Sequence, residues 1–248
     1  MGVKTLWTIL SSSGEMIDLR ELQGSSVAVD LAGWIVQNNT CKGMSGAGVS
    51  RPHLRNLFFR VATLINLNIR PVFVLDADKA PDLKKETLGL RKKAAMGPSQ
   101  SSSQVEVKTT RTRLKGLMNE CKALLDSLGI PSVKAHGEAE ALCAKLNAAK
   151  VVDAVISDDS DAFCYGAQML LRNFSISSSG SQIERYSISK LEESLGLDRN
   201  RLIVMAICLG CDFCPNGVPG VGKETLVQLF DHWPASWNAL GALRCWIK

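Results

Sequence analysis

Short apolar runs that fit buried strands alternate with segments of helical periodicity along most of this chain, and that alternation sets the fold class. We predict strands at residues 26–30, 70–76, 130–135 and 153–158. Helical patterns begin near His53, Arg113, Gly137 and Arg199. Strands and helices in this order predict a mostly parallel sheet with helices on both of its faces. The expected fold class is α/β.

The composition agrees with a globular protein that buries a substantial core. The 248 residues are 46% hydrophobic. No apolar run reaches the roughly 18 residues that a membrane span needs, and the N-terminus lacks the features of a signal peptide, so we expect no membrane partner. Eight cysteines without a secretory signal indicate reduced thiols in the cytosol or the nucleus. The net charge of +5 mildly favours a polyanionic partner.

Basic residues gather on either side of a small-polar stretch. The first group comprises Lys84, Lys85, Arg91, Lys92 and Lys93, and the second comprises Lys108, Arg111, Arg113 and Lys115. Between them, GPSQSSSQ at residues 97–104 cannot bury enough apolar surface to offset the entropy of ordering it. We interpret the region as a mobile basic strap. Two solvated helix faces joined by a loop are the alternative.

Three of the predicted strands end in aspartate: the first in Asp30, the second in Asp76, and the last in the group Asp158, Asp159 and Asp161. The carboxyl ends of parallel strands open on one crevice, where α/β proteins bind their ligands. A single aspartate at such a point is usually a turn or helix-cap residue. Three acidic strand ends at the same edge predict a cation site instead.

Other acids fit the same edge of the sheet. Glu138 and Glu140 begin a helix and flank its apolar face, although acids are favourable in a first helical turn without any ligand. Asp212 follows the C-terminal end of an apolar helix, where the helix dipole opposes a carboxylate unless a cation compensates.

The predicted ligand set contains only carboxylates: Asp30, Asp76, Glu138, Glu140, Asp159, Asp161 and Asp212. Oxygen-only sites favour Mg²⁺ or Mn²⁺ over zinc. Seven acids exceed what one ion requires, and two ions about 4 Å apart could promote in-line phosphodiester hydrolysis. We therefore expect two Mg²⁺ ions, with Mn²⁺ as a substitute.

A glycine-rich turn comes directly after these acids. Gly217, Gly220 and Gly222 precede a helix that starts near Lys223. Backbone N–H groups of such a turn can hold a phosphate without reading base sequence. A nucleotide-binding loop is disfavoured, because Glu224 replaces the hydroxyl residue that its pattern requires and a helix precedes the turn.

Three cysteines in this region, Cys208, Cys211 and Cys214, have a spacing that superficially fits an iron–sulfur ligand run. No fourth cysteine is close in sequence. We interpret Cys208 and Cys211 as small apolar residues on a helix face.

Seven segments resemble, in order and spacing, the flap endonuclease and XPG superfamily of structure-specific 5′ nucleases: MGV, VAVD, HLRNLFFR, PVFVLD, GEAEA, DDSDAF and LGCDFCPNGVPGVGKE. The third and the last are most similar to the GEN branch, the Holliday junction resolvases. The resemblance runs from Met1 to about Phe230. It implies a PIN-like nuclease fold, a Mg²⁺-dependent cut beside a branch point, and a helix-two-turn-helix element that grips duplex DNA with the help of K⁺.

The resemblance also implies roles for single residues. It places the seven acids on the family's metal positions, with Asp30 and Asp159 also catalytic, and leaves Asp158 outside that set. Lys84 and Arg91 match the basic pair that reaches the scissile phosphate. The implied DNA-binding residues are Gly2, Gly217, Gly220, Gly222 and Lys223.

Departures from the flap endonucleases narrow the substrate. Val36 stands where those enzymes have a stacking tyrosine, with Trp34 nearby, and the strap is short and rich in serine. Both features favour a branched junction over a threaded 5′ flap. After Phe230, the sequence no longer looks like the family's continuing helix.

We therefore expect four regions. They are an N-terminal nuclease region at 1–95, a short flexible basic arch at 96–112, an internal nuclease region at 113–212, and a helix-two-turn-helix element with an atypical end at 213–248. The expected function is nuclear cleavage of branched DNA in repair and recombination, with dimerisation on four-way junctions. The alternatives are a flap endonuclease of replication and excision repair, and a branch-binding protein without turnover.

Overall fold

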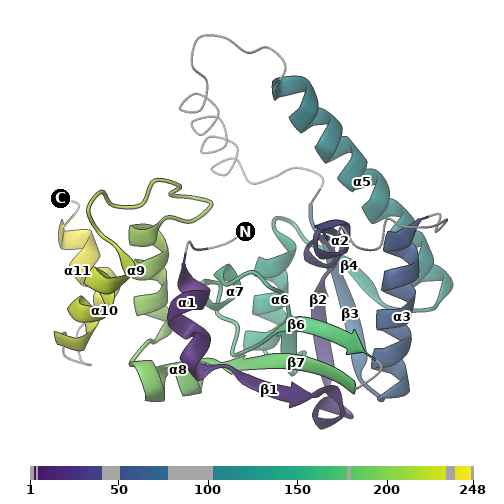
Figure 1. Ribbon diagram of the computed structural model, residues 1–248, viewed down its shortest axis with the longest axis horizontal. Helices are drawn as coiled ribbons and strands as arrows, with labels where there is room; N and C mark the ends of the chain where they lie inside the picture. Colours follow the sequence, from purple (N-terminus) through teal and green to yellow (C-terminus); the bar gives the residue numbers. More distant parts are fainter. Residues whose placement is uncertain are drawn as a thin grey trace.

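The computed structural model describes residues 3, 5–40, 51–77, 103–177, 180–232 and 238–246. Its strands are β1 Glu15–Asp18, β2 Ser26–Asp30, β3 Arg70–Leu75, β4 Ser132–Lys134, β5 Ala154–Ile156, β6 Met169–Ser177 and β7 Gly180–Ser187. They form one sheet in the order β1-β7-β6-β5-β2-β3-β4 (Figure 1). The five strands from β6 to β4 run parallel, whereas β7 and β1 are antiparallel to their neighbours. The predicted mostly parallel sheet is confirmed.

Helices lie on both faces of this sheet, and the last two lie beside the helix that precedes them (Figure 1). They are α1 Leu6–Leu10, α2 Leu31–Thr40, α3 Pro52–Asn66, α5 Ser103–Ser127, α6 Ala139–Ala148, α7 Asp161–Cys164, α8 Ile188–Leu195, α9 Arg199–Leu209, α10 Lys223–His232 and α11 Ala239–Trp246, with 3₁₀ turns η1 Ser11–Ser13 and η2 Leu19–Leu22. Helix α5 begins ten residues before Arg113, where its amphipathic pattern starts, and projects away from the sheet (Figure 1). None of the described helices is long and apolar enough to cross a membrane.

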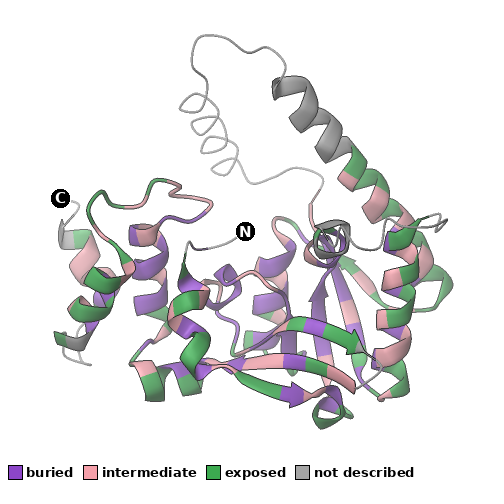
Figure 2. Ribbon diagram, in the orientation of Figure 1, coloured by how far each residue is buried: buried purple, intermediate pink, exposed green. Residues whose placement is uncertain are grey.

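Alternation along the strands divides the core into two layers. In β3, Phe73 and Leu75 pack with α2, α3 and α5, while Val74 packs with the helices of the other face. The period of two residues places successive side chains on opposite faces of a sheet. Buried residues accordingly fill most of β2, β3 and β5 and the inner helix faces (Figure 2). Both faces are covered, so the carboxyl edge of the parallel strands is the natural place for a ligand.

Trp34 belongs to this core. Its side chain is 3% exposed and lies against Phe73 and Phe174, with ring centroids 5.6 Å and 5.2 Å away. The guanidinium of Arg60 lies 4.8 Å from the indole centroid. A tryptophan enclosed in this way cannot stack on an external base.

Candidate active site

Three neighbouring parallel strands bring acids to one edge of the sheet. Asp30 is the last residue of β2, and Asp76 follows β3. Asp159 lies in the loop after β5, and Asp161 is the first residue of α7 at the end of that loop. Because β5, β2 and β3 are adjacent and parallel, their carboxyl ends meet. Asp30 and Asp161 are buried, at 8% and 5% exposure. The predicted grouping of these acids at one edge is therefore present in the fold.

Asp30 is buried where β2 leads into α2. Burial, together with the nearby charges of Asp76 and Asp159, raises the pKa of Asp30 to about 7, although a hydrogen bond from the backbone N–H of Gly33 lowers it. That N–H donates to Asp30 Oδ1 at 3.2 Å. A Cβ at residue 33 would lie 2.9 Å from Asp30 Oδ2, so a larger residue there would displace the end of the carboxylate. The turn into α2 thus holds a carboxyl group that is costly to ionise.

Helix α6 adds two further acids to the edge. Asp76 Oδ1 accepts a hydrogen bond of 2.8 Å from the N–H of Ala139, the first residue of this helix. Glu138 is the N-cap residue, and Glu140 follows in the first turn, where it is buried. Burial raises the pKa of Glu140 well above its usual value, and the charges of Asp159 and Asp161 add to that effect. The acids therefore repel one another at close range.

The loop between β5 and α7 is fixed by local hydrogen bonds. Asp159 N–H donates to Ser157 Oγ at 3.1 Å, and Asp159 Oδ1 accepts from Asp161 N–H at 3.2 Å. Asp158 turns the other way, and its Oδ1 accepts from the N–H of Asn173 in β6 at 2.9 Å. The implied exclusion of Asp158 from the metal set agrees with this orientation.

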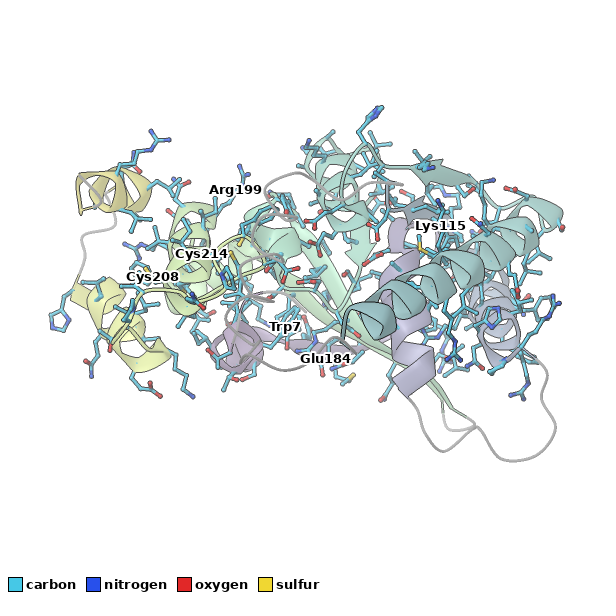
Figure 3. The ribbon with its side chains drawn as sticks, turned by 90° about the horizontal axis from the view of Figure 1, so that it is seen from above. Trp7, Lys115, Glu184, Arg199, Cys208 and Cys214 are labelled. Carbon is cyan, nitrogen blue, oxygen red and sulfur yellow. The ribbon has the colours of Figure 1, made fainter. Side chains whose placement is uncertain are left out.

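Helix α1 secures the same loop from the N-terminal side. The indole N–H of Trp7 donates to the carbonyl oxygen of Asp158 at 2.8 Å. Arg172 lies 4.0 Å from the centroid of the Trp7 ring and 3.7 Å from a carboxylate oxygen of Glu184. Seen from above, Trp7 and Glu184 lie close together (Figure 3). The strand β6, the strand β7 and α1 thereby hold the acidic loop in place.

Asp212 follows a residue that lies near one of the buried acids. It is half-buried and follows Cys211, which is close enough to Asp161 for that charge to contribute to the raised pKa of its thiol, after the larger effect of burial. Figure 3 shows Cys208 and Cys214 near each other on this segment. Cys208 is buried on α9, and Cys211 is buried one residue beyond the cap of that helix.

Tyr165 is a site residue that the sequence did not reveal. Its hydroxyl donates a hydrogen bond of 2.9 Å to Glu138 Oε2, so it joins the end of α7 to the start of α6. Burial raises the pKa of Tyr165, which keeps the phenol protonated as a donor. The sequence signal that could have identified Tyr165 is its position four residues after Asp161, because this spacing places the two residues on one side of a helical turn.

The acids suit a hard divalent cation, although their carboxylate groups are spread along the edge of the sheet. Across the described ranges, no three carboxylate, imidazole or thiol side chains are close enough to enclose a metal ion as they stand. The donors are all oxygens, and burial and mutual repulsion raise the pKa of two of them. A divalent cation relieves such repulsion, so the residues present fit Mg²⁺ or Mn²⁺.

The glycine turn packs tightly on the end of α9. Gly217 and Gly220 have left-handed backbones, with φ of 62° and 80°. Val218 N–H donates to the carbonyl oxygen of Cys208 at 2.8 Å, and α10 begins at Lys223. Gly222, the remaining predicted glycine, precedes α10 directly. The other predicted contacts, Gly2, Lys84 and Arg91, lie outside the described residues.

Replacing Gly217 with Ala should destabilise this turn strongly. A Cβ there would lie 2.3 Å from the Cys208 carbonyl oxygen, and alanine also disfavours a left-handed backbone. We expect a loss of about 3 kcal/mol or more in the free energy of unfolding of this region. Gly220→Ala is the matched control, because a Cβ there meets nothing within 4 Å and only the backbone cost of about 1 kcal/mol remains. Urea unfolding of both variants measures the difference, and equal losses would contradict the tight packing.

A mostly parallel sheet with acids at its carboxyl edge, followed by a glycine turn between two helices, defines the PIN-like class of nuclease folds. The XPG N-terminal domain family matches residues 1–97, and the XPG I-region family matches residues 129–212. The chain belongs to the XPG family.

Similar proteins agree with this assignment. Flap endonuclease GEN homolog 1 of Mus musculus is 45% identical over 246 residues, which are 94% of this chain and 26% of that protein. Human GEN1, solved in complex with Holliday junction DNA, is 39% identical with a TM-score of 0.78, covering 99% of this chain and 61% of that one. The Holliday junction-resolving enzyme GEN1, solved with product DNA and a Mg²⁺ ion, is 28% identical with a TM-score of 0.68, covering 93% and 51%. The chain thus spans about a quarter of the length of the mouse relative.

Proposed function

We propose that this chain is the nuclease region of a Mg²⁺-dependent endonuclease that cleaves branched DNA. The observation that carries the proposal is the group of buried, mutually repelling acids at the carboxyl edge of the sheet, represented by Asp30 and Glu140. A cation and a polyanionic substrate together would offset this repulsion. The GEN relatives support DNA as the substrate, since human GEN1 was solved with a Holliday junction.

The proposed metal ligands are the acids predicted from the sequence. We assign the ions to Asp30, Asp76, Glu138, Glu140, Asp159, Asp161 and Asp212. When bound, two Mg²⁺ ions would stabilise the attacking water and the leaving oxygen of the phosphodiester. Asp30 and Asp159 come from adjacent strands and would hold the ions from two sides. The buried edge limits access of bulk water, which strengthens every charge interaction there.

Contacts to the DNA backbone are assigned to basic and glycine-rich segments. Lys84 and Arg91 would contact the scissile phosphate, where positive charge stabilises the transition state. Backbone N–H groups of the turn from Gly217 to Gly222 would hold a phosphate of the duplex, with K⁺ and Lys223 adding charge. Two copies on one four-way junction would place a site at each of two strands. A chromosomal substrate implies nuclear localisation.

The environment of Trp34 favours a junction over a threaded flap. The flap enzymes' stacking tyrosine is replaced by Val36, an aliphatic residue that is 37% exposed. The nearby aromatic residue, Trp34, is enclosed by Phe73 and Arg60 and cannot take over that role. A displaced 5′ strand would therefore lack base stacking at this position.

Paired cleavage assays test the proposal. Labelled four-way junction and 5′-flap DNA are incubated with the chain in Mg²⁺ at matched salt, since backbone contacts make binding strongly salt-dependent. We expect both to be cut, the junction faster. The Asp30→Ala/Asp159→Ala double variant is the control, and cleavage no greater than its background would contradict the proposal. Binding in Ca²⁺ without any product in Mg²⁺ would instead indicate a branch-binding protein.

A further inference from the structure

We propose that Tyr165 is a positioning residue that makes the acidic site prefer Mg²⁺ over Ca²⁺. The inference rests on the proposed function, because it assigns a role to a contact of one of the proposed metal ligands. Tyr165 touches neither substrate nor reacting atoms in this assignment. It acts through Glu138.

The hydrogen bond lies at the junction of the two helices that carry acids. Tyr165 is the C-cap residue of α7, whose first residue is Asp161, and its backbone N–H donates to the Asp161 carbonyl oxygen at 3.1 Å. Its hydroxyl reaches Oε2 of Glu138, the N-cap residue of α6, at 2.9 Å. The Glu138 side chain makes no capping hydrogen bond to its own helix. The phenol is thus a contact that orients this carboxylate from the side of α7.

The phenol restricts how Glu138 can bind an ion. An ion held by both carboxylate oxygens must share Oε2 with the hydroxyl or displace it. Ca²⁺ accepts six to eight oxygens and often takes a carboxylate through both of them, whereas Mg²⁺ requires a near-ideal octahedron and usually takes one oxygen from each carboxylate. A hydroxyl that occupies Oε2 therefore disfavours the binding mode of Ca²⁺ and permits that of Mg²⁺. Partners of ligand residues commonly influence metal affinity in this way.

The chain offers a matched control for removing the hydroxyl. Its two tyrosines are Tyr165 and Tyr186. Tyr186 also donates its hydroxyl to a glutamate, Glu184 Oε2, at 3.1 Å, and Glu184 is not among the acids at the carboxyl edge. Tyr186→Phe removes the same group and the same kind of hydrogen bond from a glutamate that contacts Arg172, on the Trp7 side of the acidic loop, and is not a proposed metal ligand.

Calorimetric titration of the 248-residue chain with Mg²⁺ alone and with Ca²⁺ alone tests the proposal. In Tyr165→Phe, the ratio of Mg²⁺ to Ca²⁺ affinity should fall about tenfold relative to the wild type, and in Tyr186→Phe it should stay unchanged. A ratio that is the same in both variants, with normal uptake by the wild type, would overturn this inference and leave the proposed function intact. Uptake of neither ion by the wild type would overturn both.

Inhibition provides a second measurement that depends on the same ratio. Ca²⁺ should inhibit Mg²⁺-supported cleavage by Tyr165→Phe at about a tenfold lower ratio of Ca²⁺ to Mg²⁺ than it does for the wild type. A variant that has only lost stability would cleave more slowly at every ratio, without this shift. Such a uniform loss would count against the role of Tyr165 in metal preference.

Discussion

Asp30→Asn should abolish cleavage of branched DNA, with a loss of about 10³-fold or more in rate. A metal-bound transition state depends on several kcal/mol of charge stabilisation, and an amide cannot replace a carboxylate ligand in supplying it. The amide oxygen can still accept the N–H of Gly33, now 3.2 Å from Asp30 Oδ1, so the fold should be retained. Single-turnover cleavage of a labelled four-way junction in Mg²⁺ measures the effect.

Asp158→Asn is the control for this prediction. Asp158 precedes Asp159, but its Oδ1 faces the N–H of Asn173, and an amide oxygen can accept the same bond. Its rate should stay within a few-fold of the wild type. A rate above a tenth of the wild-type value in Asp30→Asn, or equal losses in both variants, would remove Asp30 from the metal site.

In metal-free buffer, the free energy of unfolding should fall as the pH rises from about 4 to about 7. Burial and the charges of Asp76 and Asp159 raise the pKa of Asp30 to about 7 in the folded state, from an ordinary value of 3.8. The folded protein therefore binds a proton that the unfolded chain releases, and this stabilisation is lost as the pH passes through the folded-state pKa. The difference amounts to about 4 kcal/mol as an upper bound, and Glu140 shifts in the same direction.

Urea unfolding at a series of pH values in a chelator measures this loss. Asp30→Asn should flatten the curve and should be more stable than the wild type at pH about 8, since it has no charge to bury. Saturating Mg²⁺ should raise the stability of the wild type at the same pH and leave the variant nearly unchanged. A wild-type curve that is flat across this interval would show that the carboxyl groups are solvated and not mutually repelling.

The sequence predicts the parallel part of the sheet well, because buried parallel strands form continuous apolar runs. The expected strands at 26–30 and 70–76 correspond closely to β2 and β3. The hairpin of β6 and β7 is harder to foresee. Only part of each strand is buried, and a register shift between Arg172 and Ser175 interrupts the period-two pattern.

The candidate site is predictable where topology alone decides it. Asp30, Asp76 and Asp159 lie at the carboxyl ends of β2, β3 and β5, which are neighbours in the sheet. Their position at one edge could therefore be inferred from the sequence. The hydroxyl of Tyr165 meets Glu138 only after α7 packs beside α6, across 27 positions of sequence. The four-residue spacing from Asp161 indicates the side of α7 on which Tyr165 lies, but it does not indicate that the hydroxyl reaches Glu138. The N-terminal part of α5 was missed for a different reason. Its residues are mostly polar and form no apolar stripe, so the sequence gives no sign of a buried helix face there.

The hydrogen bond from Ala139 to Asp76 gives the protein a built-in amide reporter. The carboxylate of Asp76 follows β3 and also accepts the first N–H of α6. An ion that draws on Asp76 must share it with this cap, so occupancy of the edge should alter the protection of the Ala139 amide against deuterium exchange. Exchange at one backbone position, followed by mass spectrometry or NMR, would then register cation loading in the absence of DNA and of any turnover.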